Sequence, residues 1–192
     1  MTTKTASPFT PSDKVNAFNF RAFADACRDA LGEGGRGPDA IVQLVTDAIA
    51  DLGALKAGLP ELTEDETLLH MCDRVTIFAI RLTPGLLYPP HNHFMPVVIG
   101  LYGGAETNIT YDEVDETLVS TGKKHLKAPA VHRLPEPAIH AVVNEGQDYS
   151  EALHVYCGNL ANTNRNVWDL ERQKKLTFTE ERYFGLSQQL SA

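Results

Sequence analysis

Two segments near the start of the chain repeat apolar residues every three or four positions, as one face of a helix does. We expect the first helix to begin after Ser12, which has a capping side chain, and to end in the glycine-rich run 32–37. The second should begin at Pro38, which suits a first helical turn, and end between Gly53 and Gly58. The two apolar stripes are Val15, Phe18, Ala22, Ala26 and Ala30, and Ile41, Val45, Ala48, Ile49 and Leu52.

After about residue 68 the pattern changes to short apolar or alternating stretches that are separated by turn residues. The turns recur at intervals of roughly 8–12 residues, which is typical of a β-sandwich or a barrel. The predicted strands are 74–82, 96–103, 106–112, 115–120, 139–143 and 151–157. The expected fold is therefore mainly β, a barrel with two or three N-terminal helices packed outside it.

We find no internal repeat and no linker, so we expect one structural domain made of four parts. These are a flexible lead-in (1–12), an N-terminal helical segment (13–67), the barrel (68–161) and a C-terminal extension (162–192). The extension is polar and charged, and its aromatic residues can anchor it to the barrel. They are Trp168, Phe178, Tyr183 and Phe184.

The overall composition, with 43% hydrophobic and 22% charged residues, is that of a globular protein. A formal net charge of −8 without a basic patch argues against a nucleic-acid partner, because such proteins gather Lys and Arg. No apolar run approaches the roughly 18–20 residues of a membrane helix, and residues 1–20 lack the apolar core of a secretory signal. Cys27, Cys72 and Cys157 are scattered and odd in number, which favours a reducing compartment, with the cytoplasm as the expectation.

The segment from Gly85 to His93 contains two histidines, His91 and His93, two positions apart. On an extended chain such residues point to the same face, roughly 7 Å apart along the strand, so both imidazoles can reach one metal ion. Pro89 and Pro90 disfavour a helix and support this interpretation. The alternative is a pair of surface histidines.

A third histidine, His140, begins an apolar strand directly after the proline-rich turn 135–137. Taken alone, it could equally be a buried histidine that is bonded to a backbone carbonyl. Two other histidines, His125 and His132, should have structural roles or be exposed. Glu106 should form hydrogen bonds or lie at the surface rather than bind a metal.

Together the two histidine segments resemble the paired motifs of the cupins. The first motif reads Gly-x5-His-x-His-x3–4-Glu-x6-Gly, and the second reads Pro-x-Gly-x2-His-x3-Asn. The matching residues are Gly85, His91, His93 and Gly104, followed by Pro135, His140 and Asn144. The resemblance implies a double-stranded β-helix, or jelly-roll barrel, with one divalent metal inside its mouth on His91, His93 and His140.

Two departures from the cupin motifs narrow the resemblance. Val97 or Val98 stands where the motif has its glutamate ligand, and Pro137 replaces the glycine of the second motif. A neutral three-histidine site is similar to that of the thiol dioxygenases, the cysteine dioxygenase group. The stretch from Leu69 to Asn159 also resembles a bacterial set of cysteine-dioxygenase-like cupins of unassigned substrate.

His154 and Tyr156 match the last two residues of the Ser-x-His-x-Tyr pattern of the thiol dioxygenases, which implies catalytic roles beside the metal. Ala152 replaces the serine of that pattern, and Ser150 shares its strand face. The arginine that holds the substrate carboxylate in cysteine dioxygenase has three candidates, Arg74, Arg81 and Arg133.

The resemblance implies an oxidoreductase, an iron(II) dioxygenase that oxidises a small thiol or related molecule with O2. Imidazole ligands also suit Zn2+ and Ni2+, and Mn2+ is a further alternative, so the ligands alone do not identify the metal. Two alternatives are a non-redox metal-dependent isomerase or lyase, and a non-catalytic cupin that binds a small ligand. By the same resemblance we expect a monomer or a homodimer.

Overall fold

The computed structural model describes residues 17–190, and its first element is the helix α1 (Phe20–Ala30). The side chain of Asn19 caps it by accepting a hydrogen bond from the Ala22 amide at 3.0 Å. Residues 17–19 are not helical, so the prediction of one helix running on from Ser12 is wrong: the cap is Asn19. Ser12 itself and the predicted lead-in lie outside the described residues.

The second predicted helix is divided into two. α2 (Pro38–Ala50) begins at its proline as expected, and α3 (Leu52–Gly58) follows after a single residue. Asp51 is extended, and its side chain accepts a hydrogen bond from the Ala54 amide at 2.9 Å. Asp51 therefore ends one helix and caps the next, which the apolar stripe does not reveal. None of the helices described is long and apolar enough to cross a membrane.

The strands begin after these helices, and each of the six predicted strands overlaps one of them. They are β1 (Glu66–Met71), β2 (Thr76–Leu82), β3 (Leu86–Asn92), β4 (Val97–Gly103), β5 (Ala105–Val114), β6 (Thr117–Lys127), β7 (Ala130–Leu134), β8 (Ile139–Val143), β9 (Ser150–Tyr156), β10 (Asn166–Asp169), β11 (Lys174–Thr177) and β12 (Gln188–Gln189). A 3₁₀ turn (Leu160–Asn162) precedes β10, and the helix α4 (Glu180–Gly185) precedes β12.

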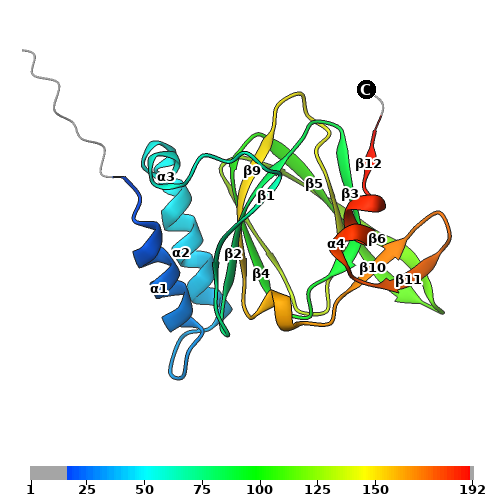
Figure 1. Ribbon diagram of the computed structural model, residues 1–192, viewed down its shortest axis with the longest axis horizontal. Coiled ribbons are helices and arrows are strands. Elements are labelled where there is room, and N and C mark those ends of the chain that lie inside the picture. The colour runs from blue at the N-terminus through cyan, green and yellow to red at the C-terminus, as the bar shows by residue number, and fades with distance from the viewer. Residues whose placement is uncertain (1–16, 191–192) are drawn as a thin grey trace, which may run out of the picture.

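These strands form two antiparallel sheets that enclose a barrel (Figure 1). One sheet has the order β1-β2-β9-β4-β7, and the other has the order β11-β10-β3-β8-β5-β6, with β12 also paired to β3. Within them, the eight strands β2 to β9 follow the order of a jelly roll, four in each sheet. The expectation of a double-stranded β-helix with helices outside it is therefore confirmed.

The helices α1, α2 and α3 cover the outer face of the sheet that contains β2, β9 and β4 (Figure 1). On β4, Val98 packs outward against the helices, whereas Val97 faces an apolar cluster inside the barrel. This two-sided burial explains why β4 reads as a continuous apolar run. At Gly100, an added Cβ would lie 2.4 Å from a methyl carbon of Val45, so glycine allows α2 to approach the sheet.

The C-terminal segment completes the wall on the other side of the barrel (Figure 1). β10 and β12 both pair with β3. The Tyr183 ring, from α4, stacks on the Tyr88 ring of β3 with the centroids 4.9 Å apart. The C-terminal segment thus covers the edge of β3 that lies opposite β8.

Candidate metal centre

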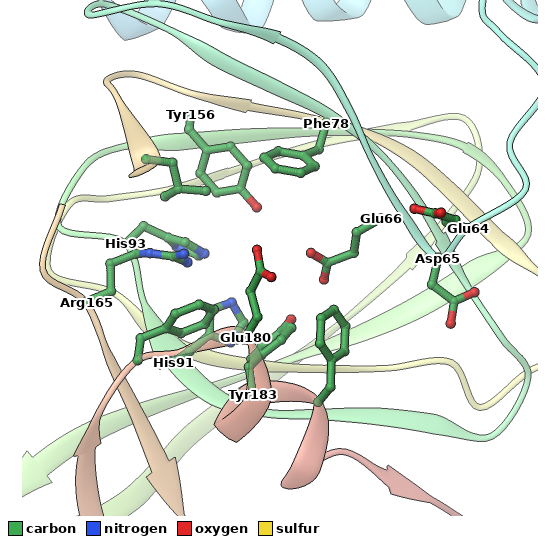
Figure 2. Close-up of a pocket in the computed structure, with 13 residues that line it drawn as sticks. Glu64, Asp65, Glu66, Phe78, His91, His93, Tyr156, Arg165, Glu180 and Tyr183 are labelled. Atoms are coloured by element: carbon green, nitrogen blue, oxygen red, sulfur yellow. The ribbon is translucent and has the colours of Figure 1, made fainter. Parts of the chain in front are cut away.

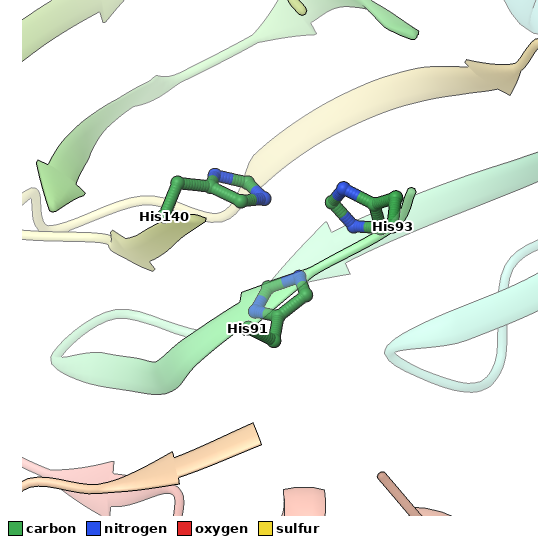
Figure 3. A group of neighbouring side chains, drawn as sticks. All are labelled: His91, His93 and His140. Atoms are coloured by element: carbon green, nitrogen blue, oxygen red, sulfur yellow. The ribbon is translucent and has the colours of Figure 1, made fainter. Parts of the chain in front are cut away.

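The register of β3 and β8 brings the two histidine segments together. His91 lies directly opposite His140 across this antiparallel pair. His93 follows the last residue of β3 and points to the same side as His91, as the spacing predicts (Figure 3). The register shifts between Tyr88 and His91, where two consecutive prolines supply no backbone N–H to the ladder.

The three imidazoles form a compact buried cluster. One ring nitrogen from each of His91, His93 and His140 lies within 4.8 Å of the other two. The ring centroids are 4.6–5.1 Å apart, and each residue is at most 5% exposed. In the described part of the chain, this is the one group of three ligand-type residues close enough to hold an ion.

Hydrogen bonds set the tautomers of two of these histidines. His91 donates from Nδ1 to the Pro89 carbonyl at 2.9 Å, and His140 donates from Nδ1 to Asn108 Oδ1, also at 2.9 Å. Each Nε2 therefore keeps its lone pair, and the Nε2 of His140 is buried with no hydrogen-bond partner among the described residues. Metal-binding histidines typically donate their other nitrogen in this way, so the donor set fits a metal ion.

Burial keeps the cluster in its neutral form. It lowers the pKa of His91 to about 4, and it lowers the pKa values of His93 and His140 well below the usual range. The closeness of His91 to the other two adds to the effect on them. Neutral imidazoles are the form that binds metals, so the site is ready for an ion at neutral pH.

Neither residue at the place of the cupin glutamate can bind a metal. Val97 belongs to the apolar cluster inside the barrel, and Val98 packs toward the helices. Glu106 at the start of β5 is buried, and both of its carboxylate oxygens accept hydrogen bonds. Of its two expected roles, hydrogen bonding and surface exposure, it has the first. The structure therefore brings together three histidines and no carboxylate.

A chain of hydrogen bonds between buried polar side chains begins at His140 Nδ1, on the side of the ring away from Nε2. Asn108 Oδ1 accepts the hydrogen bond from His140 Nδ1, and Asn108 Nδ2 donates to Glu106 Oε1 at 3.0 Å. Ser150 donates its hydroxyl to Glu106 Oε2 at 2.8 Å. Burial raises the pKa of Glu106, while these two hydrogen bonds oppose the rise. No sequence motif marks Asn108, because only the pairing of β5 with β8 brings it to His140.

Tyr156 and His154 lie on the same face of β9, and the Tyr156 hydroxyl is 3.4 Å from His154 Nδ1. The Tyr156 ring is 5.1 Å from the His93 ring, centroid to centroid, and burial raises the pKa of its phenol. Ala152 packs in the apolar cluster inside the barrel, and Ser150 bonds Glu106 instead. The His–Tyr pair is therefore present without the serine of the thiol dioxygenase pattern.

The histidine cluster opens into a pocket with a volume of about 360 Å³ (Figure 2). His91, His93 and Tyr156 form one part of its wall. Apart from Leu160 of the 3₁₀ turn, the remaining wall is aromatic and charged, and it comes from β1 and the residues before it, β2 and the C-terminal segment. Its aromatic members are Phe78, Phe178, Tyr183 and Phe184, and its charged members are Glu64, Asp65, Glu66, Arg165 and Glu180.

None of the three arginines that the sequence suggested lines this pocket. Arg81 stacks on the Tyr149 ring, and Arg133 forms an ion pair with Asp39 of α2. Arg74 also lies outside the lining of the pocket. The arginine of the pocket is Arg165, which stands between the 3₁₀ turn and β10. No motif surrounds it, so only the path of the chain could identify it.

The other histidines and the motif glycines have structural roles. His125 is near the Thr107 hydroxyl at 3.2 Å, His132 accepts from Lys124 at 3.0 Å, and neither lines the pocket. Gly85 and Gly104 have positive φ angles of 77° and 64°, which favour glycine. The turn at Pro137 closes through a hydrogen bond from the Ala138 amide to the Pro135 carbonyl at 3.1 Å.

The comparisons with known proteins identify no relative by sequence: no family model and no curated protein matches the chain. Among solved structures, the chain is similar to a conserved protein with a double-stranded β-helix domain from Klebsiella pneumoniae, with a TM-score of 0.44 and 12% identity over 57% of this chain and 84% of that one. A cupin superfamily protein from Desulfitobacterium hafniense has a TM-score of 0.41 and 22% identity over 52% and 84%.

A DMSP lyase from Ruegeria pomeroyi is similar with a TM-score of 0.40 and 18% identity, over 49% of this chain and 43% of the lyase chain. The chain therefore spans less than half of the lyase. These similarities are weak and assign no activity. The double-stranded β-helix is established by the strand order of the chain itself.

Proposed function

We propose that the protein is a metal-dependent dioxygenase that binds iron(II) on His91, His93 and His140 and oxidises a small thiol or related molecule with O2. The observation that carries the proposal is the set of three buried, neutral imidazoles without a carboxylate, at the inner end of a pocket of substrate size. The resemblance of His154 and Tyr156 to the thiol dioxygenase pattern supports it further.

In this proposal, a bound iron(II) ion would supply the one-electron chemistry that couples O2 to the substrate. The residues of the chain bind and orient the reactants. The apolar cluster inside the barrel excludes water on one side of the histidines. Tyr156, which keeps its proton because burial raises its pKa, is placed to donate a hydrogen bond to a reactant near His93.

The first test is the metal content of protein purified without chelators, together with O2 uptake by the iron(II) form on a panel of small thiols. We expect close to one ion per chain, lost in His140→Ala and retained in His125→Ala, a histidine that does not line the pocket. Thiol-dependent O2 uptake would support the full proposal. Metal bound without O2 uptake would contradict the dioxygenase, and equal binding by His140→Ala would contradict the site.

Tyr156→Phe tests the role of the phenol separately. The variant keeps the ring that packs against Phe78 and removes only the hydroxyl. We expect unchanged metal content and an O2 uptake rate lower by about a hundredfold, the usual scale for loss of a proton-donating group. A variant with the full rate would show that Tyr156 is only part of the wall.

A further inference from the structure

The charged groups of the pocket are unequal in number, with four carboxylates and one guanidinium. Glu64 and Asp65 precede β1, Glu66 lies in β1, and Glu180 begins α4. These segments are far apart in the sequence, so the fold gathers the acidic groups around one opening. Within residues 17–190, none of the four carboxylates forms a salt bridge.

Arg165, the one cation of the pocket, offsets the charge of these four acids only in part. The Arg165 guanidinium lies over the Phe178 ring, 3.7 Å from its centroid, and makes no ion pair with Glu66 or Glu180. Burial raises the pKa of Glu66 to about 7, although the nearby Arg165 charge and Tyr183 hydroxyl oppose the rise. A partly buried carboxylate without an ion-pair partner costs free energy, and a cation placed beside it would recover part of that cost.

The walls of the pocket fit the same kind of ligand. Glu66 and Glu180 point into the space in front of the histidines and the Tyr156 hydroxyl (Figure 2). His93, one of the three candidate metal ligands, is 3% exposed and lines the pocket, so it marks the end of the ligand space opposite the carboxylates. Aromatic faces attract cations, and Arg165 on Phe178 shows one ring of this wall doing so.

We propose that the pocket selects a small substrate bearing a positive charge, an ammonium or onium group that Glu66 and Glu180 hold while the other end faces the three histidines. The inference rests on the proposed function, because it names the substrate class of the same site. An anionic group at that end would meet four carboxylates and be repelled. A small amine should therefore bind better than the corresponding amino acid.

Three thiols of similar size and different charge test this selection: 2-aminoethanethiol, 2-mercaptoethanol and 3-mercaptopropionate. Their affinities are measured by calorimetry on zinc-loaded protein, in which oxidation does not interfere. The decisive quantity is the effect of Glu66→Gln on each affinity, since the different acidities of the thiols cancel in that ratio. We expect about tenfold weaker binding of the cationic thiol, no change for the neutral one and tighter binding of the anion.

Glu180→Gln serves as the second variant, because Glu180 is exposed and its replacement leaves the core intact. Glu61→Gln, an exposed acid outside the pocket, is the matched control and should change none of the affinities. If both pocket variants weaken all three thiols equally, or weaken none, the inference is overturned.

Two cations without a thiol, n-propylammonium and tetramethylammonium, separate this inference from the proposed function. If they bind with the same dependence on Glu66 while no thiol binds, the substrate class stands and the thiol chemistry is refuted. If thiols bind whatever their charge and the two cations do not, the selection for cations is refuted and the proposed function stands. If tetramethylammonium binds more tightly than n-propylammonium, the aromatic walls are the principal contact. If n-propylammonium binds more tightly, the carboxylates are.

Discussion

At the scale of single residues, the hydrogen bonds that set the tautomers of His91 and His140 differ in whether a substitution can remove the acceptor. His91 donates to a backbone carbonyl, which no substitution removes, whereas His140 donates to the side chain of Asn108. Asn108 is fully buried and also donates to Glu106. The Asn108 side chain therefore has two hydrogen-bond partners, and a substitution at this position tests how far it supports His140.

We expect Asn108→Ala to lower metal affinity by about 10–100-fold, because His140 loses the acceptor that fixes its tautomer and ring. Stability should fall by about 1–3 kcal/mol, since buried polar groups lose partners. Competition with a chromophoric chelator measures the affinity, and urea unfolding measures the stability. Asn164→Ala, at an exposed position, should alter neither. A stable variant with unchanged affinity would remove Asn108 from any positioning role.

At the scale of secondary structure, β3 depends on a segment from the end of the described chain. Tyr183 of α4 is 6% exposed and contacts both the Tyr88 ring and the His91 ring, with centroids 4.9 and 5.0 Å apart. The neighbouring Phe184 is 47% exposed. Two adjacent aromatic residues on one short helix thus differ in burial, which makes them a matched pair.

Tyr183→Ala should cost about 3–5 kcal/mol of stability, because it leaves a cavity between α4 and the strand that carries His91. Phe184→Ala should cost about 1 kcal/mol or less, since exposed side chains contribute little. Urea unfolding of the metal-free variants provides both values. Equal losses for the two variants would show that α4 does not support β3 in this way.

At the scale of the whole molecule, the sequence predicts what depends on local pattern. Strand alternation places His91 and His93 on one face without knowledge of their neighbours, and the apolar runs mark most strands of the barrel. Arg165 and Asn108 escape prediction, because their roles depend on β3, β5, β8 and β10 meeting across the sheet. The proline pair hides β3 from strand patterns, although both prolines lie within it.

The buried histidines also determine how the stability of the whole protein depends on pH. Five histidines have lowered pKa values, the four buried ones and the partly buried His132; the pKa is about 4 for His91 and about 3 for His154. Below about pH 6.5 the unfolded chain binds protons at these positions and the native chain does not, so stability falls as the pH falls. Glu66 and Glu106, with raised pKa values, act in the opposite direction but are only two.

Metal-free protein should therefore lose stability between about pH 6.5 and pH 4, with each shifted histidine contributing at most about 1.4 kcal/mol per pH unit. Urea midpoints at several pH values across this range test the expectation. His154→Gln, which removes one of the buried imidazoles, should flatten the dependence relative to the parent. A midpoint that stays constant or rises toward pH 4 would contradict it.

The pairing of His91 with His140 across β3 and β8 has a consequence during protein synthesis. The ribosome releases His91 and His93 well before His140, so a nascent chain holds two ligands on an unpaired strand and has no complete site. The three-histidine site is complete only once β8 has paired with β3. The order of the ligands along the chain thus delays capture of an ion until the barrel can enclose it.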